Sequence, residues 1–272
     1  GQQQGRARAK QDAAIVALLE GRFGRARQFA DEVLAIPGSS GLSALIGARA
    51  AITTREFDVA EALLARPDAS VPSLAVPRLM LEAEMKLEQG QPLEALRILG
   101  LLRKEAGSHT AAVRLELRAL QGAGRYAEIP ALVDQLVKRK VYGAPEGEFV
   151  RAAAHAQELA ARVLDGEGLR AYWAKLSDAE QRMPKIARAA AKSFIALGGD
   201  REAAERLARS LEREWNPDLV ALYAQCRPAD GAPQLGHELA PGVQAVLRPV
   251  QLDQVEPVDE PMAQPVFFQG KG

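Results

Sequence analysis

The stretch Gly21-Arg22-Phe23-Gly24-Arg25-Ala26 has the composition of a surface turn that leads into a helix. Related stretches recur at corresponding places: Thr54-Arg55-Glu56-Phe57-Asp58-Val59-Ala60, Gly90-Gln91-Pro92-Leu93-Glu94-Ala95, Gly124-Arg125-Tyr126-Ala127-Glu128-Ile129 and Gly198-Gly199-Asp200-Arg201-Glu202-Ala203. The first four turns are separated by steps of 34, 35 and 34 residues, and the last follows after 74 residues. The last step equals two periods plus a small insertion.

This period is that of a helix–turn–helix repeat of the tetratricopeptide type. The composition agrees with helices, because Ala, Leu, Arg and Glu are abundant and aromatic residues make up only 5% of the chain. The sequence therefore predicts an all-α fold, a tetratricopeptide-type α-solenoid. This is a superhelix of antiparallel helix hairpins, here with a Pro-rich, non-helical C-terminal tail.

Three parts are expected along the chain. Residues 6–140 hold four helix-hairpin repeats, and residues 141–225 hold an irregular Trp-containing segment, a further hairpin and the start of a terminal helix. Residues 226–272 form the Pro-rich tail, expected to be flexible. Apolar periodicity places the helices at 8–20, 23–35, 42–52, 59–65, 74–88, 92–104, 108–121, 126–140, 149–164, 169–176, 184–197, 201–215 and 217–225.

Breakers define the segments between these helices. Residues 1–5 show no pattern and are excluded from the first helix, and residues 68–73 form a linker that contains Pro72. Residues 141–148 are expected to be a loop because they contain Gly143, Pro145 and Gly147. Ser177 and Glu180 have the spacing of a capping box at the start of a short helix.

The tail is set apart by proline. Seven prolines interrupt every window in which a helix could form: Pro228, Pro233, Pro241, Pro249, Pro257, Pro261 and Pro265. An extended or disordered segment is expected, although the alternation of Val243, Ala245 and Leu247 also suits a short strand or a docked segment. The apolar run Val266-Phe267-Phe268 is a candidate either for packing back on the body or for contacts in a crystal.

Charge and cysteine content exclude several classes of function. The 35 basic and 35 acidic residues balance, so no global field favours nucleic acid or an anionic membrane. A single cysteine, Cys226, excludes an intrachain disulfide and a clustered cysteine metal site. No apolar run is long enough to cross a bilayer, and the chain as given is expected to be soluble.

Catalytic and ligand-binding motifs are weak. His109, His155 and His237 do not converge in sequence, and no hydrolase, metalloprotease, phosphate-binding or dinucleotide motif is present. His109 is expected to be a polar turn residue. We expect no catalytic residues, no metal ligands and no cofactor.

Two further groups have a structural and a functional interpretation. Trp173 and Trp215 are expected to pin the irregular segment onto the last repeat, rather than to stack on a ligand. Cys226-Arg227-Pro228 is interpreted as a lone thiol rather than a haem ligand. The basic residues Arg22, Arg25, Arg27 and Lys138-Arg139-Lys140 are expected to be solvated and balanced by nearby acids, with peptide anchoring as the alternative.

A stacked array of hairpins also offers a concave surface lined by the first helix of each unit. Such a surface suits extended segments or helices of partner proteins. Protein binding is therefore the expected activity. The Pro-rich tail is a candidate internal ligand of the same surface.

The second half of the chain resembles the proteobacterial HemY family. The resemblance is carried by Gly168-Leu169-Arg170-Ala171-Tyr172-Trp173-Ala174-Lys175-Leu176, Arg182, Pro184, Leu197-Gly198, Ala203-Ala204 and Trp215-Asn216-Pro217-Asp218-Leu219-Val220-Ala221-Leu222-Tyr223. At the start, Arg6-Ala7-Arg8-Ala9-Lys10 and Leu18-Leu19-Glu20-Gly21 are similar to the region after the family's membrane anchor. The resemblance covers residues 6–225. Residues 227–272 are Pro-rich, whereas members of the family continue into another hairpin after the segment that resembles 215–223.

The resemblance implies a non-catalytic protein-interaction scaffold associated with late steps of protoheme (porphyrin) biosynthesis. It also implies an inner-membrane protein, anchored by upstream helices absent from this chain, with the repeats facing the cytoplasm. Partners would be proteins, among them tetrapyrrole-biosynthesis enzymes, with no nucleic acid. Two alternatives are a tetratricopeptide adaptor for envelope assembly and a protein that binds porphyrin directly.

Overall fold

The computed structural model describes residues 2–38, 40–107 and 109–226, and the regular structure in these ranges is helical. The α-helices of the N-terminal part are α1 (Gln2–Leu19), α2 (Phe23–Leu34), α3 (Gly41–Thr53), α4 (Phe57–Leu64), α5 (Ala75–Glu88), α6 (Pro92–Ala106), α7 (Thr110–Gly122) and α8 (Ile129–Lys138). Those of the C-terminal part are α9 (Ala144–Ala161), α10 (Gly166–Lys175), α11 (Asp178–Gln181), α12 (Pro184–Ala196), α13 (Asp200–Arg213) and α14 (Pro217–Gln225). Short 3-10 turns are η1 (Pro67–Ser70), η2 (Pro72–Leu74) and η3 (Tyr126–Glu128).

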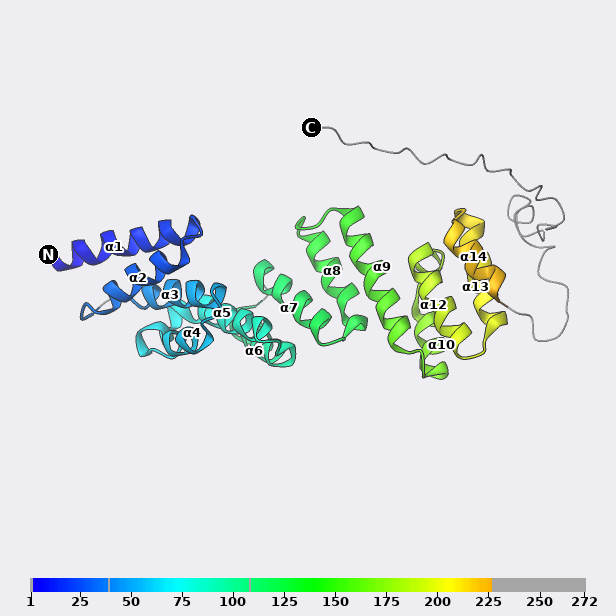
Figure 1. The fold of residues 1–272 in the computed structure, drawn as a ribbon, viewed down its shortest axis with the longest axis horizontal. Helices are drawn as coiled ribbons and strands as arrows, with labels where there is room; N and C mark the ends of the chain where they lie inside the picture. Colours follow the sequence, from blue (N-terminus) through cyan, green and yellow to red (C-terminus); the bar gives the residue numbers. More distant parts are fainter. Residues whose placement is uncertain (1, 39, 108, 227–272) are drawn as a thin grey trace, which may run out of the picture.

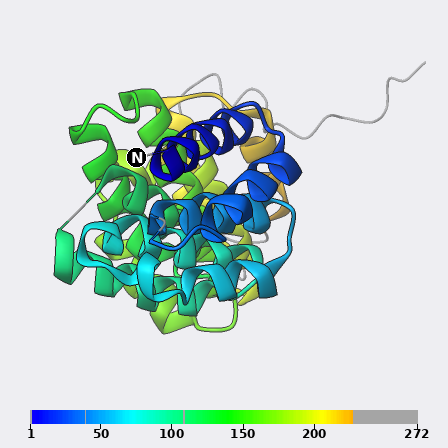
Figure 2. The same ribbon diagram turned by 90° about the vertical axis from the view of Figure 1, so that its left-hand side faces the viewer.

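The helices pack in sequential order as an elongated array that runs from α1 to α14 (Figure 1). Within the hairpins, α1 packs on α2, α3 on α4, α5 on α6 and α12 on α13, and each hairpin contacts the next. Seen from the N-terminal end of the array, α1 and α2 lie in front and the later helices lie behind them (Figure 2). The fold is therefore an all-α solenoid, as expected.

The recurring turn has one backbone geometry at all five places. The residues at these positions have positive φ values: Gly21 (75°), Arg55 (62°), Gly90 (72°), Gly124 (68°) and Gly198 (75°). At the first turn, the Gly21 amide donates to the Leu18 carbonyl (3.1 Å) and the Arg22 amide donates to the Ala17 carbonyl (2.8 Å). The other four repeat this pair of bonds, which is the Schellman motif that ends a helix. At these five places the helix thus ends in a left-handed residue. The next α-helix begins two residues later at four of them, and after Gly124 the 3-10 turn η3 comes first and α8 begins at Ile129.

The apolar core is a series of clusters along the array instead of one centre. One cluster joins Ala44 to Met85, the next joins Leu79 to Ala119, and a third joins Val113 to Ala154. The largest lies at the C-terminal end, from Ala152 to Tyr223. Many fully buried positions are alanine, and small side chains allow neighbouring helices to approach closely.

Several predicted helix boundaries differ from the structure. The first helix begins at Gln2 and not at residue 8, because the isolated Gly5 does not stop it. The expected loop at 141–148 is also shorter, since α9 begins at Ala144. Pro145 lies in the first turn of α9, where its missing amide is harmless.

Gly147, expected in a loop, is buried inside α9. A Cβ atom at this position would lie 2.4 Å from Val137 Cγ2 and 3.4 Å from Val133 Cγ1. The glycine therefore permits close packing of α9 on α8 and does not break the helix. A pattern of breakers in the sequence cannot distinguish these two uses of glycine.

The segment that follows α9 is held by local caps. The Asp165 side chain accepts a hydrogen bond from the Gly168 amide (2.9 Å), so α10 begins at Gly166, three residues before the expected start. Ser177 and Glu180 form the predicted capping box at the start of α11. The linker at 68–73 is occupied by the turns η1 and η2.

Residues 227–272 lie outside the described part of the chain. The predictions that fall there are the non-helical tail, His237, the alternation at Val243, Ala245 and Leu247, and the apolar run at 266–268. Among the described residues, no helix combines the length and the apolar content that a bilayer crossing requires.

Candidate functional site

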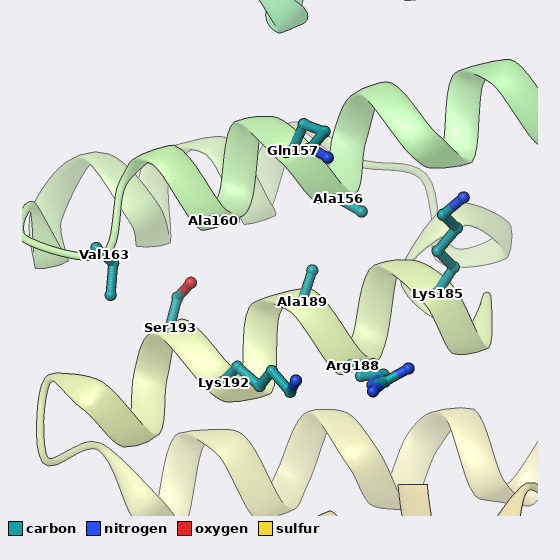
Figure 3. A pocket seen from close by; sticks show the side chains of 9 residues that line it. All are labelled: Ala156, Gln157, Ala160, Val163, Lys185, Arg188, Ala189, Lys192 and Ser193. Atoms are coloured by element: carbon teal, nitrogen blue, oxygen red, sulfur yellow. The ribbon is translucent and has the colours of Figure 1, made fainter. Parts of the chain in front are cut away.

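A hollow of about 390 Å³ lies on the surface between α9 and α12. We call it the α9/α12 hollow; it is lined by Ala156, Gln157, Ala160, Val163, Lys185, Arg188, Ala189, Lys192 and Ser193. Figure 3 shows Ala189 and Ser193 pointing from α12 toward α9, and Ala156 pointing back from α9. Both α9 and α12 are first helices of their units. The first helices are those on which partner binding is expected.

Small side chains create the hollow. Ala156 and Ala160 lie one turn apart on α9, and Ala189 faces them from α12, so no long apolar side chain fills the space. The Ser193 hydroxyl is already used, because it donates to the Leu159 carbonyl at 3.0 Å. The hollow therefore has an apolar floor, and Gln157 adds a side-chain amide on the α9 side.

Three cations border this floor. Lys185, Arg188 and Lys192 have the spacing i, i+3 and i+7, which places them on one side of α12. Arg188 lies 3.6 Å from the exposed carboxylate of Asp218. The Lys185 ammonium lies 4.4 Å from the centre of the exposed Phe149 ring.

Two of the three rim cations have no ion pair with an acid of the described chain. Some cations on other hairpins do pair with acids of the neighbouring unit, as Arg49 does with Glu84 and Arg118 with Glu88. Within residues 2–226, outside the two single-residue gaps, no carboxylate lies within 4.0 Å of Lys185 or Lys192. Chemically, the hollow suits a ligand that combines carboxylates with small apolar groups.

A buried polar cluster joins α9 to the short helices behind this hollow. His155 Nδ1 lies 2.9 Å from the Tyr172 hydroxyl oxygen, and His155 Nε2 lies 3.3 Å from Glu180 Oε1. The second approach is not aligned as a hydrogen bond, so Nε2 is without such a partner among the described residues. His155 and Tyr172 are both less than one tenth exposed.

Burial determines the protonation of this cluster. Desolvation lowers the pKa of His155, against the opposing effect of Glu180. Desolvation also raises the pKa of Tyr172 to about 12. At neutral pH the imidazole is therefore neutral and the phenol is protonated, and the two groups share a hydrogen bond.

Two arginines pack on aromatic rings around the same cluster. Arg162 donates from Nε to Glu158 Oε1 (2.8 Å) and lies 5.4 Å from the centre of the Tyr172 ring. Arg206 lies 3.9 Å from the Phe194 ring centre and 5.3 Å from that of Trp173. These cation–π contacts fasten α10 to α9, α12 and α13.

The tryptophan prediction is half right. Trp173 is buried in the C-terminal cluster and joins the irregular segment to α12 and α13, as expected. Trp215, however, is 51% exposed and does not pin the repeat. It follows the end of α13 in an extended turn, and Asn216 then caps α14, so its side chain leaves the packed interface.

The remaining candidates occupy separate places. His109 precedes α7 as a turn residue, as expected. Cys226 is half-buried at the end of α14, its Sγ donates to the Leu222 carbonyl (3.5 Å), and burial raises its pKa to about 11. Arg22 and Arg27 pair with Glu20 and Glu56, which confirms the expected balance for these two.

Sequence reasoning missed the cations of the hollow and the partners of His155. The i, i+3, i+7 spacing of Lys185, Arg188 and Lys192 was visible in the sequence and could have identified a basic face of α12. Tyr172 and Glu180 gave no such signal. Their meeting with His155 depends on how α10 and α11 fold back on α9.

The described residues hold no group of three or more His, Cys, Asp or Glu side chains arranged to bind a metal ion. Comparison with protein-family models and with curated proteins finds no match to this chain.

Proposed function

We propose that this chain is a non-catalytic protein-binding scaffold of the tetratricopeptide type. The observation that carries the proposal is the α9/α12 hollow, an apolar floor bordered by cations on the first helices of two units. The five turns of one geometry support the repeat type, because the first four follow one another at a step of one hairpin. Such arrays act by presenting an extended surface to a partner.

The proposed pathway is the late part of protoheme biosynthesis, in a protein anchored to the inner membrane with its repeats in the cytoplasm. The support is the resemblance of the 168–176 and 215–223 segments to the HemY family. In this proposal, the partners are tetrapyrrole-biosynthesis enzymes. The segment 168–176 supplies Tyr172 and Trp173 to the core behind the hollow, so its role is to hold α9 and α12 in place.

Affinity purification from native membranes tests the proposal. Tetrapyrrole-biosynthesis enzymes should be recovered with the wild-type protein, and much less with the double variant K185E/K192E. The matched control is K104E, which reverses an exposed lysine on α6, far from the hollow. Recovery of none of these enzymes with the wild-type protein would contradict the pathway, and equal recovery with K185E/K192E would contradict the site.

A deletion strain separates this proposal from a tetratricopeptide adaptor for envelope assembly. The proposed role predicts that porphyrins accumulate in the strain, whereas an envelope adaptor leaves porphyrin levels unchanged. Complementation by the wild-type gene, but not by K185E/K192E, would link the accumulation to the hollow.

A second candidate, direct porphyrin binding, is favoured by the same hollow, because a porphyrin combines an apolar ring with carboxylates. The rim could pair with two carboxylates, but its floor lacks an aromatic side chain for stacking. Titration of the purified chain with protoporphyrin tests this candidate. A saturable, stoichiometric spectral change that is lost in K185E/K192E would support it, and no saturable change would remove it.

A further inference from the structure

The C-terminal tail carries a sequence pattern that complements the α9/α12 hollow. Residues 252–260 read Leu-Asp-Gln, Val-Glu-Pro and Val-Asp-Glu, three consecutive triplets that each begin with an apolar residue followed by an acid. The triplets contain four acids and no base. The hollow presents the opposite arrangement, with three cations beside a floor of small apolar side chains.

The spacing of two lysines on α12 matches the spacing of the acids in the triplets. Lys185 and Lys192 are seven residues apart on α12, which corresponds to a rise of about 10.5 Å along the helix axis. A polyproline II helix has three residues per turn and repeats about every 9.3 Å. In that conformation, which Pro257 favours, acids three residues apart would stand at nearly the separation of the two lysines, with Leu252, Val255 and Val258 along one edge.

The tail can reach the hollow in the same molecule. The described chain ends at Cys226 after α14, and α14 packs directly on α12. The 25 residues between Cys226 and Leu252 can extend up to about 85 Å, several times the width of two neighbouring helices. The entropic cost of closing a loop of this length grows only slowly with length, so the attachment favours binding in the same chain.

We propose that residues 250–261 bind in the α9/α12 hollow of their own chain. Asp253 and Glu256 pair with the cations of α12, and the apolar residues of the triplets lie on the alanine floor. A partner protein must then displace this segment, so the tail lowers the apparent affinity of the hollow. The inference rests on the hollow being the binding site in the proposed function, and it does not depend on the pathway.

Zero-length carbodiimide crosslinking of the full chain tests this directly, because it joins only carboxylates and lysines that are in contact. Mass spectrometry should find Lys185 or Lys192 linked to Asp253, Glu256, Asp259 or Glu260 on the monomer. The crosslinks should weaken at high salt, which screens exposed charge pairs. Absence of these crosslinks from the monomer, or their presence only in a crosslinked dimer, would overturn the proposal.

The acylation rates of the lysines give a second measurement in the full chain. Lys192 should react more slowly in the wild-type chain than in the variant D253N/E256Q/D259N, whereas the exposed Lys104 should react equally in both. With an effective concentration of roughly 1 mM and an intrinsic dissociation constant of about 0.1 mM, the expected protection is about tenfold. Equal acylation rates of Lys192 in the wild-type chain and in D253N/E256Q/D259N would overturn the proposal, since α12 is the same in both chains.

The experiments distinguish a failure of tail docking from a failure of the proposed function. If the tail does not dock but K185E/K192E still loses partner enzymes, only the internal ligand is wrong. If the tail docks and no tetrapyrrole enzyme is recovered even with D253N/E256Q/D259N, the pathway is wrong and the docking stands.

Discussion

Arg55 adopts a left-handed backbone conformation at a turn position where four equivalent turns have glycine. A residue with a Cβ atom pays roughly 1 kcal/mol for this conformation. Arg55 offsets part of that cost through contacts, because its guanidinium donates to the Glu88 carbonyl (3.2 Å) and lies 5.2 Å from the centre of the Phe57 ring. The turn geometry therefore persists where the glycine does not.

The glycine turns predict that a Gly→Ala substitution changes the free energy of unfolding in opposite directions at a turn and inside a helix. Gly90→Ala should lower the free energy of unfolding by about 1 kcal/mol, since φ is 72° and no atom lies within 4 Å of the new Cβ. Gly100→Ala, at an exposed site inside α6 with equally free space, should raise it by about 1 kcal/mol. Urea unfolding of both variants measures this, and changes of the same sign would contradict the backbone explanation.

His155 makes stability depend on pH. Its pKa in the folded protein lies below the ordinary value of 6.5, so the unfolded chain binds more protons than the folded chain below about pH 6.5. The free energy of unfolding should therefore decrease as the pH falls from 7 to 5. For one proton, the slope cannot exceed about 1.4 kcal/mol per pH unit.

Substitution of His155 should remove the pH dependence of the free energy of unfolding that this residue causes. His155→Gln should flatten the dependence between pH 7 and 5, while His109→Gln, at an exposed turn, should leave the wild-type slope. Urea unfolding at several pH values measures the slopes. Parallel slopes for the wild-type chain and His155→Gln would show that another group is responsible.

At the scale of elements, α9 joins the regular hairpins to the C-terminal units. It packs on α8 through Gly147 and on α12 along the hollow. Its start could not be predicted from sequence, because Gly143, Pro145 and Gly147 together have the composition of a loop. Only the position of Val137 on α8 shows that the third of these residues is a packing glycine.

Gly147→Ala tests this interpretation. The new Cβ would lie 2.4 Å from Val137 Cγ2, so overpacking should cost about 1–3 kcal/mol of unfolding free energy. Gly143→Ala is the matched control, because its Cβ would meet only Pro145 Cδ at 3.8 Å, and its effect should stay within about 0.5 kcal/mol. Equal, small effects in thermal or urea unfolding would mean that the α8–α9 contact is looser than described.

At the scale of the whole molecule, the core is divided among neighbouring hairpins, and stability in such arrays is approximately a sum of local terms. Both tryptophans, Trp173 and Trp215, lie in the C-terminal part. A change in the fluorescence of the buried Trp173 therefore reports on the C-terminal cluster, whereas circular dichroism reports on all helices.

Because the core is divided among hairpins, truncating a core residue in one cluster should shift the unfolding transition seen by fluorescence differently from the transition seen by circular dichroism. Phe194→Ala should remove about 3–5 kcal/mol from the C-terminal cluster and move the fluorescence transition to lower urea, leaving residual helicity. Ile52→Ala, in an N-terminal cluster, should lower the first circular dichroism transition with little change in fluorescence. Coincident transitions in both variants would instead show one cooperative unit.

The sequence by itself determined the helical class, the hairpin order and the five turn positions, because glycine punctuation and apolar periodicity are local and repeat along the chain. Tertiary structure alone decided that Trp173 is buried while Trp215 is exposed, and that His155 meets Tyr172. It also decided that the cations of α12 border a hollow. These features depend on contacts between helices that are distant in sequence, and such contacts leave no period in the sequence.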